Sequence, residues 1–132
     1  MSLEFLGIRK KSKRLYLDFN FYCEEEKFFL QIGYRKNENC YSYNCKIFGT
    51  YILYYRRYLK KQGKAYNPKL KLEDFKAYAS FLKEYIKGVH LHNFWFSNAL
   101  QTRQNLEKEI NFIEALILFL KENEKSIRKD IK

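Results

Sequence analysis

Polar and apolar side chains alternate along two stretches in the first third of the chain. In residues 15–22 every second residue is apolar, from Leu15 to Phe21, and residues 28–35 repeat the pattern. A period of two is typical of a strand with one buried face. The polar run 23–26 lies between the two stretches, so together they predict an antiparallel hairpin.

Further strand patterns flank this hairpin on both sides. Residues 3–8 predict a strand that a tight basic turn at 10–13 joins to the hairpin, and a turn at 37–39 leads into a similar alternation at 41–47. Polar residues at these joints are typical of turns. The N-terminal part therefore predicts a three- to four-stranded antiparallel meander, with one apolar face and one face of mixed polarity.

The period changes from two residues to about 3.6 in the second part of the chain. A helix is predicted over 52–59, with Thr50 placed to cap its free N–H groups. The proline-containing segment 64–71 predicts a loop. A second helix is predicted over 72–86, with Gly88 placed to end it.

A third and longest helix is predicted to begin between residues 93 and 97 and to end near residue 123, and the charged tail 121–132 is expected to fray. Its apolar positions form two adjacent stripes, which is wider than one packing surface needs. Either the first two helices or a second copy of the chain covers the surplus, and both alternatives stay open. The stripes are Leu106, Ile110, Ile113, Ile117 and Leu120, and beside them Phe112, Leu116 and Phe119.

These elements predict an α+β fold in a single domain, residues 1–132, with the sheet in 1–49 and the helical part in 50–132. About three C-terminal helices are expected to pack on one face of the antiparallel meander. The chain has 132 residues, 46% hydrophobic and 19% aromatic. It is therefore long and apolar enough to bury one core, which excludes an intrinsically disordered protein.

The cysteines and the apolar runs bear on the compartment. Cys23, Cys40 and Cys45 form an odd and sparse set, which favours a reducing environment over a disulfide framework. The longest unbroken apolar run, 115–120, is far too short to span a membrane, and the N-terminus does not resemble a signal peptide. A cytoplasmic protein without a membrane partner is expected.

The formal net charge of +11 lies almost wholly in one half of the chain. Residues 1–71 carry 16 Lys and Arg against 6 Asp and Glu, whereas residues 72–132 carry 10 against 9. A basic bias shared by the whole chain would have spread over both halves. The asymmetry therefore predicts a functional basic surface with a polyanionic partner, nucleic acid first.

Two clusters of cations and one set of rings are the candidate contacts with DNA or RNA. Cations neutralise phosphates and release counterions, and flat rings on an open sheet face stack on unpaired bases. The predicted nucleic-acid-binding residues are Arg9, Lys10, Lys11, Lys13 and Arg14 at the first turn, Arg56, Arg57, Lys60, Lys61 and Lys64 on the first helix and its exit, and Tyr16, Tyr22 and Phe29 on the mixed face of the sheet.

Residues 9–62 combine a basic hairpin with a basic helix. This pattern resembles two nucleic-acid-binding modules, the PUR-type repeat that binds single strands and the arm-binding domain of phage tyrosine recombinases. The resemblance rests on pattern and includes no diagnostic motif. The His-x-x-Arg motif of a recombinase is absent, because neither His90 nor His92 has Arg at the third following position.

Two weaker patterns concern metal chemistry. Two cysteines and two histidines, the ligand types of a zinc site, are Cys40, Cys45, His90 and His92. The odd spacing of the two cysteines disfavours this site, because on one strand they would point to opposite faces. Asp18, Glu25 and Lys27 match the outline of a metal-dependent nuclease, but Glu25 falls in a turn. No metal, no cofactor and no enzymatic activity are expected.

The leading interpretation is a small, basic nucleic-acid-binding protein that acts through the basic turn, the basic helix and the aromatic sheet face. The alternative is a protein-interaction, inhibitor or assembly factor, for instance from a mobile element. It would act through the C-terminal helix, with a protein partner or as a homodimer, and through the loop 89–96, which contains both histidines and the single tryptophan.

Overall fold

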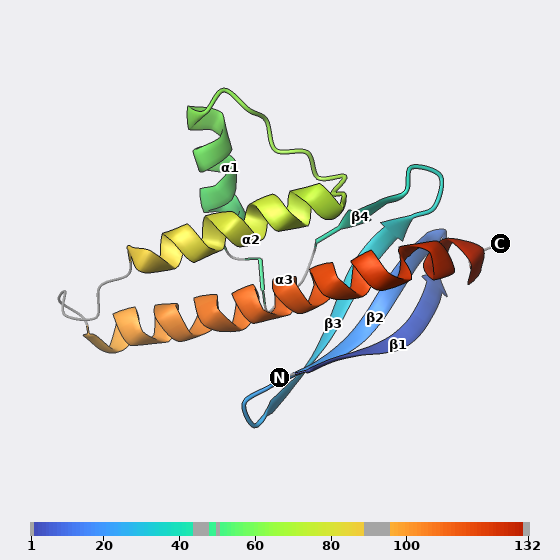
Figure 1. Ribbon diagram of the computed structural model, residues 1–132, viewed down its shortest axis with the longest axis horizontal. Helices are drawn as coiled ribbons and strands as arrows, with labels where there is room; N and C mark the ends of the chain where they lie inside the picture. Colours follow the sequence, from blue (N-terminus) through green and yellow to red (C-terminus); the bar gives the residue numbers. More distant parts are fainter. Residues whose placement is uncertain (1, 44–47, 50, 89–95, 131–132) are drawn as a thin grey trace.

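The computed structural model describes residues 2–43, 48–49, 51–88 and 96–130. Four antiparallel strands form one sheet in the order β1-β2-β3-β4, which confirms the predicted meander (Figure 1). Consecutive strands are neighbours throughout, so the sheet contains no crossover. The strands are β1 (Ser2–Lys11), β2 (Arg14–Cys23), β3 (Glu26–Arg35) and β4 (Cys40–Ser42).

Three helices follow the sheet, and they are α1 (Ile52–Lys61), α2 (Leu72–Lys87) and α3 (Phe96–Asp130). α3 lies across one face of the sheet, α2 runs beside α3, and α1 lies beyond α2, apart from the strands (Figure 1). The α+β fold with one helix-covered sheet face is therefore confirmed. None of the described helices is long and apolar enough to cross a membrane.

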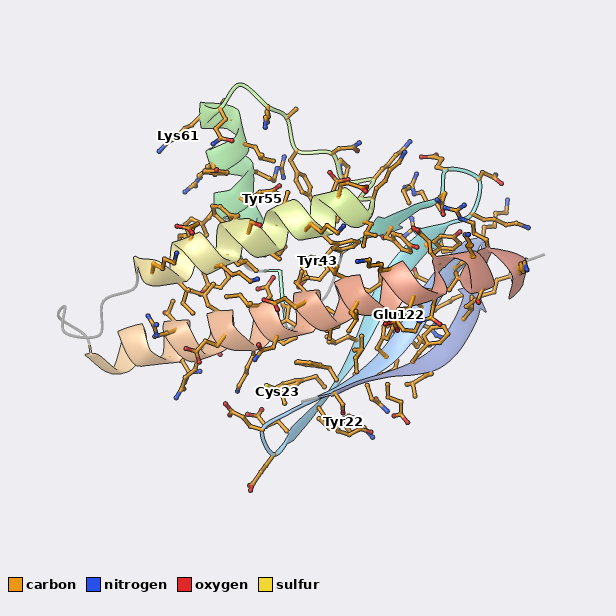
Figure 2. All side chains as sticks on the ribbon, viewed as in Figure 1. Tyr22, Cys23, Tyr43, Tyr55, Lys61 and Glu122 are labelled. Atoms are coloured by element: carbon orange, nitrogen blue, oxygen red, sulfur yellow. The ribbon has the colours of Figure 1, made fainter. Side chains whose placement is uncertain are left out.

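The alternation in β2 sorts its side chains between the two faces of the sheet. The rings of Phe19 and Phe21 pack against Phe119 and Phe112 of α3, with ring centroids 5.2 Å and 5.5 Å apart. Figure 2 shows the same division at the end of the strand, where Cys23 points toward α3 and Tyr22 points away from it. Burial of one such ring contributes roughly 1.5–3 kcal/mol.

Both apolar stripes of α3 belong to the core of the single chain. Phe112 and Phe119 contact the sheet, and the side chains of Leu106 and Ile113 are fully buried in the same core. α2 packs beside α3 and supplies the remaining cover, with Leu82 fully buried. Since the surplus width is used inside one chain, it no longer requires a second copy.

A buried carboxylate joins the helices to the segment that follows the sheet. Glu109 on α3 accepts hydrogen bonds from the hydroxyls of Tyr78 (2.6 Å) and Tyr43 (3.0 Å) and from the N–H of Gly49 (3.2 Å), all at Oε2. A buried charge is tolerated when it is bonded in this way. Burial raises the pKa of Glu109, although these hydrogen bonds act in the opposite direction.

The fourth strand and the first cap differ from the expectation. β4 ends at Ser42, whereas the sequence predicts strand over 41–47, of which 44–47 lie outside the described residues. The outer edge of β4 is taken by the loop, because Tyr41 and Leu70 exchange two backbone hydrogen bonds of 2.7 and 2.8 Å. Thr50 also lies outside the described residues. The N-cap of α1 is Tyr51, whose side chain makes no capping hydrogen bond.

The prediction that residues 121–132 fray is wrong for most of their length, because α3 continues to Asp130. Tertiary contacts hold this last part of the helix. Ile127 is buried in the core, and Arg128 Nε donates a hydrogen bond of 3.0 Å to Asn39 Oδ1 in the turn between β3 and β4. The high charge of these residues therefore led to a wrong prediction for a helix end that packs on the sheet.

Candidate nucleic-acid interface

Three segments that are distant in the sequence meet at one end of the sheet. In an antiparallel meander the β1–β2 turn and the β3–β4 turn lie at the same end of the sheet. Lys11 pairs with Arg14, and the residues after Arg14 pair with those before Arg35, so Arg35 lies beside Arg14 in the sheet. The C-terminal end of α3 reaches the same end, where Arg128 bonds to Asn39 (Figure 1).

We call this region the cationic end. Within the described part of the chain, no salt bridge joins the exposed Lys10, Lys11, Lys13, Arg14 or Lys36 to a carboxylate. A nearby carboxylate, Glu38, pairs with Lys69 at 2.8 Å and with Arg35 at 3.9 Å, and the hydrogen bond from Lys69 lowers the pKa of Glu38. The cationic end therefore carries several free positive charges. It consists of Lys10, Lys11, Lys13, Arg14, Arg35, Lys36 and Arg128.

Reasoning from the sequence missed Arg35, Lys36 and Arg128. They occur singly or as a pair, so no local run of charge drew attention to them. For Arg35 and Lys36 a signal existed, because the first and third strands of an antiparallel meander run in the same direction and end at the same end of the sheet. For Arg128 no signal existed, because the tail was expected to fray.

A bulge in β1 decides which face the cations of this strand occupy. The pairing with β2 shifts between Phe5 and Gly7, and Gly7 adopts a φ of 123°, a conformation that suits glycine. Without the bulge, every odd-numbered residue of β1 would face α3 together with Phe5. The shift turns Arg9 and Lys11 to the opposite face, where Arg9 lies across from Tyr16.

Arg9, predicted as a phosphate contact, is engaged within the sheet. Its Nε donates to Asp18 Oδ2 at 2.9 Å, and its guanidinium lies 5.0 Å from the centre of the Tyr16 ring. The hydrogen bond to Asp18 raises the pKa of Arg9 further. Arg9 therefore neutralises the Asp18 carboxylate and covers one side of Tyr16.

The three predicted rings lie on the face away from α3, but they are not equivalent. The ring of Phe29 is 51% exposed and contacts none of the other rings that the structure describes. Tyr22 is half-buried and close to it, because Phe29 pairs with Asn20, two residues before Tyr22. Such diagonal neighbours are roughly 7–8 Å apart. Tyr16 lies six residues from Tyr22 along β2, about 20 Å away.

Glu4 lies on this open face and limits where phosphates can bind. Its Oε1 accepts hydrogen bonds from Asn20 Nδ2 at 3.0 Å and from the hydroxyl of Tyr22 at 3.1 Å. The bond from Asn20 and then that from Tyr22 lower the pKa of Glu4, so its carboxylate remains charged. The surroundings of Phe29 therefore suit an uncharged base better than a phosphate.

The other end of the sheet carries negative charge. The β2–β3 turn contains the exposed side chains of Glu24, Glu25 and Glu26. Lys108 on α3 pairs with Glu26 at 2.8 Å, beside a groove of about 550 Å³ that Glu24 also lines. The sheet is therefore polarised, with cations at one end and carboxylates at the other.

The second predicted cluster of cations lies on a different surface. α1 lies at the upper left of the molecule and the cationic end at the right, and Lys61 points outward from α1 (Figures 1 and 2). The structure therefore does not bring the two predicted clusters into one surface. The exposed cations of α1 and its exit are Arg56, Arg57, Lys60, Lys61 and Lys64.

In the described part of the chain, no group of three or more His, Cys, Asp or Glu residues is arranged to hold an ion. Cys40 is buried on β4, whereas Cys45, His90 and His92 lie outside the described residues. Most of the loop with the histidines and tryptophan, residues 89–95, also lies outside them.

The residues of the nuclease outline lie apart in the sheet. Asp18 pairs with Gln31, whereas Lys27 pairs with Tyr22, four residues farther along β2 and about 13 Å away. The carboxylate of Asp18 is also held by the guanidinium described above. These side chains therefore do not converge on one point.

No family model, no curated protein and no solved structure matches this chain. Its function is therefore inferred from its own surfaces.

Proposed function

We propose that the protein binds nucleic acid, DNA or RNA, through the cationic end, with the open face of the sheet as the second part of the contact. The observation that carries this proposal is the gathering of cations from three distant segments at one end of the sheet. Like charges in such proximity repel one another. A polyanion removes this repulsion, and the counterions that it releases drive binding.

The charge polarity of the sheet supports a direction for the bound strand. Phosphates bind at the cationic end, and they avoid the β2–β3 turn with its three glutamates. Between these ends the open face offers the exposed ring of Phe29. An unpaired base stacks on such a ring, whereas the bases of a duplex are already stacked and paired. Single strands are therefore the preferred ligand.

The proposal is tested by fluorescence anisotropy with labelled oligonucleotides of equal length, as single- and double-stranded DNA and RNA, across a salt series. We expect the logarithm of the association constant to fall linearly with the logarithm of the salt concentration. We also expect single strands to bind more tightly than duplexes. If the protein binds none of these ligands at low salt, or if its affinity does not depend on salt, the proposal is wrong.

The proposed binding involves no cleavage of the nucleic acid. Asp18, the carboxylate of the nuclease-like sequence pattern, is paired with Arg9 at 2.9 Å and lies far from Lys27. Supercoiled plasmid incubated with the protein and Mg²⁺ or Mn²⁺ is therefore expected to stay intact. Cleavage that disappears in Asp18→Ala would show that this part of the proposal is wrong.

A further inference from the structure

A row of aromatic rings fills the contact between α1 and α2 and remains partly open to solvent. Neighbouring ring centroids are 5.1 to 5.9 Å apart along the row. Tyr54 and Tyr58 are 41% and 43% exposed, and the other three rings are half-buried. We call this row the aromatic seam. It consists of Tyr51, Tyr54 and Tyr58 at and on α1, and Phe81 and Tyr85 on α2.

An exposed leucine lies on the outer side of α1. Tyr55 is buried and points toward α2, where its ring lies 5.2 Å from those of Tyr78 and Phe81 (Figure 2). Leu53 lies two positions earlier, roughly 200° around the helix, and its side chain is 52% exposed. Exposure of an aliphatic side chain such as that of Leu53 to water is energetically unfavourable. An apolar surface on a helix at the outside of the molecule is typical of an interaction site.

Cations surround this apolar surface, and among the described residues no salt bridge joins them to a carboxylate. The guanidinium of Arg57 lies 5.8 Å from the Tyr54 ring centre, and that of Arg56 lies 5.7 Å from the Tyr66 ring centre. From residue 39 to residue 72 the chain contains no Asp or Glu. The positive charge therefore complements an acidic partner, not another part of this segment.

The arrangement of the rings favours a protein over a nucleic acid. Each ring of the seam packs against at least one other ring at interplanar angles of 35° to 53°, so its neighbours cover part of each ring. Stacking of a base requires a free face, as Phe29 has on the sheet. Tyrosine, arginine and a central apolar side chain with a charged rim are instead the composition of a protein-interaction hot spot.

We propose that the aromatic seam, together with Leu53 and the cations of α1, is the docking surface for an acidic protein segment that carries aliphatic or aromatic side chains. The apolar side chains of the segment cover Leu53, Tyr54 and Tyr58. Its carboxylates pair with the guanidinium and ammonium groups around them. This surface is separate from the cationic end (Figure 1), so the proposal does not depend on nucleic-acid binding.

The test uses the full chain and a random peptide library displayed on phage. We expect the selected peptides to combine several Asp or Glu residues with Leu, Phe or Trp, and to compete with one another for one site. A synthetic peptide from the selection is then measured by anisotropy. Leu53→Asn and Tyr58→Ala are each expected to weaken its binding by about tenfold or more, the effect of removing a hot-spot side chain.

Leu118→Asn is the matched control, because Leu118 on α3 is 57% exposed and lies outside the seam. Its affinity for the peptide is expected to equal that of the wild type. If Tyr58→Ala lowers the thermal midpoint, Leu53→Asn decides, because the Leu53 side chain is already half in solvent. The proposal is wrong if the selection yields no acidic peptides, or if both seam variants bind the peptide as the wild type does.

Two further probes separate protein from other anionic partners. A thymidine homopolymer and vesicles that contain phosphatidylserine are each measured against the wild type and Leu53→Asn. Equal binding of either probe to both proteins supports a separate protein site. A loss of binding to the homopolymer or the vesicles in Leu53→Asn would assign the seam to nucleic acid or to a membrane surface and would overturn the proposal.

Discussion

The cationic end and the surface of α1 have similar compositions but different geometries. Both combine Lys and Arg with aromatic rings. At the cationic end the charges come from three distant segments, and the ring of Phe29, about 20 Å away along the open sheet face, is free of other described rings. On α1 the charges follow one another in a single helix, and the rings pack against each other around Leu53. The same residue types therefore underlie two different proposals, a nucleic-acid strand at one surface and an acidic protein segment at the other.

Under these two proposals, the packing of an aromatic ring decides which kind of ligand it can bind. A ring on an otherwise open sheet presents a face to a base, whereas a ring in a packed row presents its edge and hydroxyl. Charge alone does not distinguish the two surfaces. Variants that remove equal charge, or one ring, from each surface test the comparison directly.

The largest effect is expected from truncating a side chain in the core that the cationic end and α1 share. Phe112 is fully buried, with ring centroids 5.5 Å from those of both Phe21 and Phe48. Phe112→Ala should lower the free energy of unfolding by roughly 3–5 kcal/mol, the usual cost of truncating a buried Phe. Urea denaturation measures this loss, and both kinds of binding should weaken together in the variant.

Leu118→Ala on the same helix is the control for Phe112→Ala, and its change should stay within about 0.5 kcal/mol because its side chain is exposed. Light scattering of the wild type should give the mass of a monomer, since the stripes of α3 are buried within one chain. A loss smaller than about 1 kcal/mol for Phe112→Ala would show that the sheet and helices do not share one core.

The next largest effect comes from two variants with equal loss of charge. Replacement of Lys10, Lys11, Lys13 and Arg14 by Ala should weaken single-strand binding on the order of a hundredfold at low salt. It should also reduce the slope of log affinity against log salt by up to about 3, at roughly 0.7 for each phosphate contact. The matched variant replaces Arg56, Arg57, Lys60 and Lys61 by Ala.

The α1 variant loses the same four charges, so it should retain most of the salt slope if the cationic end carries the phosphates. Anisotropy titrations at several salt concentrations measure both variants. Equal losses in the two variants would mean that net charge, and not the cationic end, determines affinity. A larger loss in the α1 variant would place the nucleic acid on α1.

A smaller effect is expected from a single ring on the open sheet face. Phe29→Ala should weaken single-strand binding by about tenfold, within the roughly 1–3 kcal/mol of one stacked base. It should leave the salt slope unchanged, because no phosphate contact is removed. Tyr54→Ala removes a similarly exposed ring from the aromatic seam and should leave nucleic-acid affinity unchanged. If Tyr54→Ala weakens single-strand binding and Phe29→Ala does not, the nucleic acid binds at the aromatic seam and not on the sheet.

The smallest effect concerns the buried carboxylate that joins the two halves. Burial raises the pKa of Glu109 above its ordinary value of 4.5, so the folded chain holds its proton at pH values where the unfolded chain releases it. The stabilising effect of this proton is complete below pH 4.5 and is lost as the pH rises through the folded pKa. Glu109→Gln should remove this dependence, at a cost of roughly 1–2 kcal/mol at low pH.

Urea denaturation of both proteins over a pH series measures this effect. The stability advantage of the wild type over Glu109→Gln should shrink as the pH rises above 4.5. The carboxylates of Glu4 and Glu38, whose pKa values are lowered, have the opposite pH dependence, and it is common to both proteins. An advantage that grows with pH would show that Glu109 is stabilised as the anion.

The sequence by itself determined the strands of the hairpin, the helices and the one covered face of the sheet. Alternation over 15–22 and 28–35 is a local pattern, and the position of each side chain depends on its immediate neighbours. The first two helices likewise end within a few residues of the predicted positions. The run of cations around Lys11 was visible for the same reason.

Tertiary structure alone decided how these elements are used. The β1 bulge turned Arg9 toward Asp18, and docking of Ile127 extended α3 to the cationic end. These outcomes depend on contacts between residues that are far apart in the sequence. Local periodicity contains no information about them, because it reports the face on which a side chain lies and not the partner that it meets there.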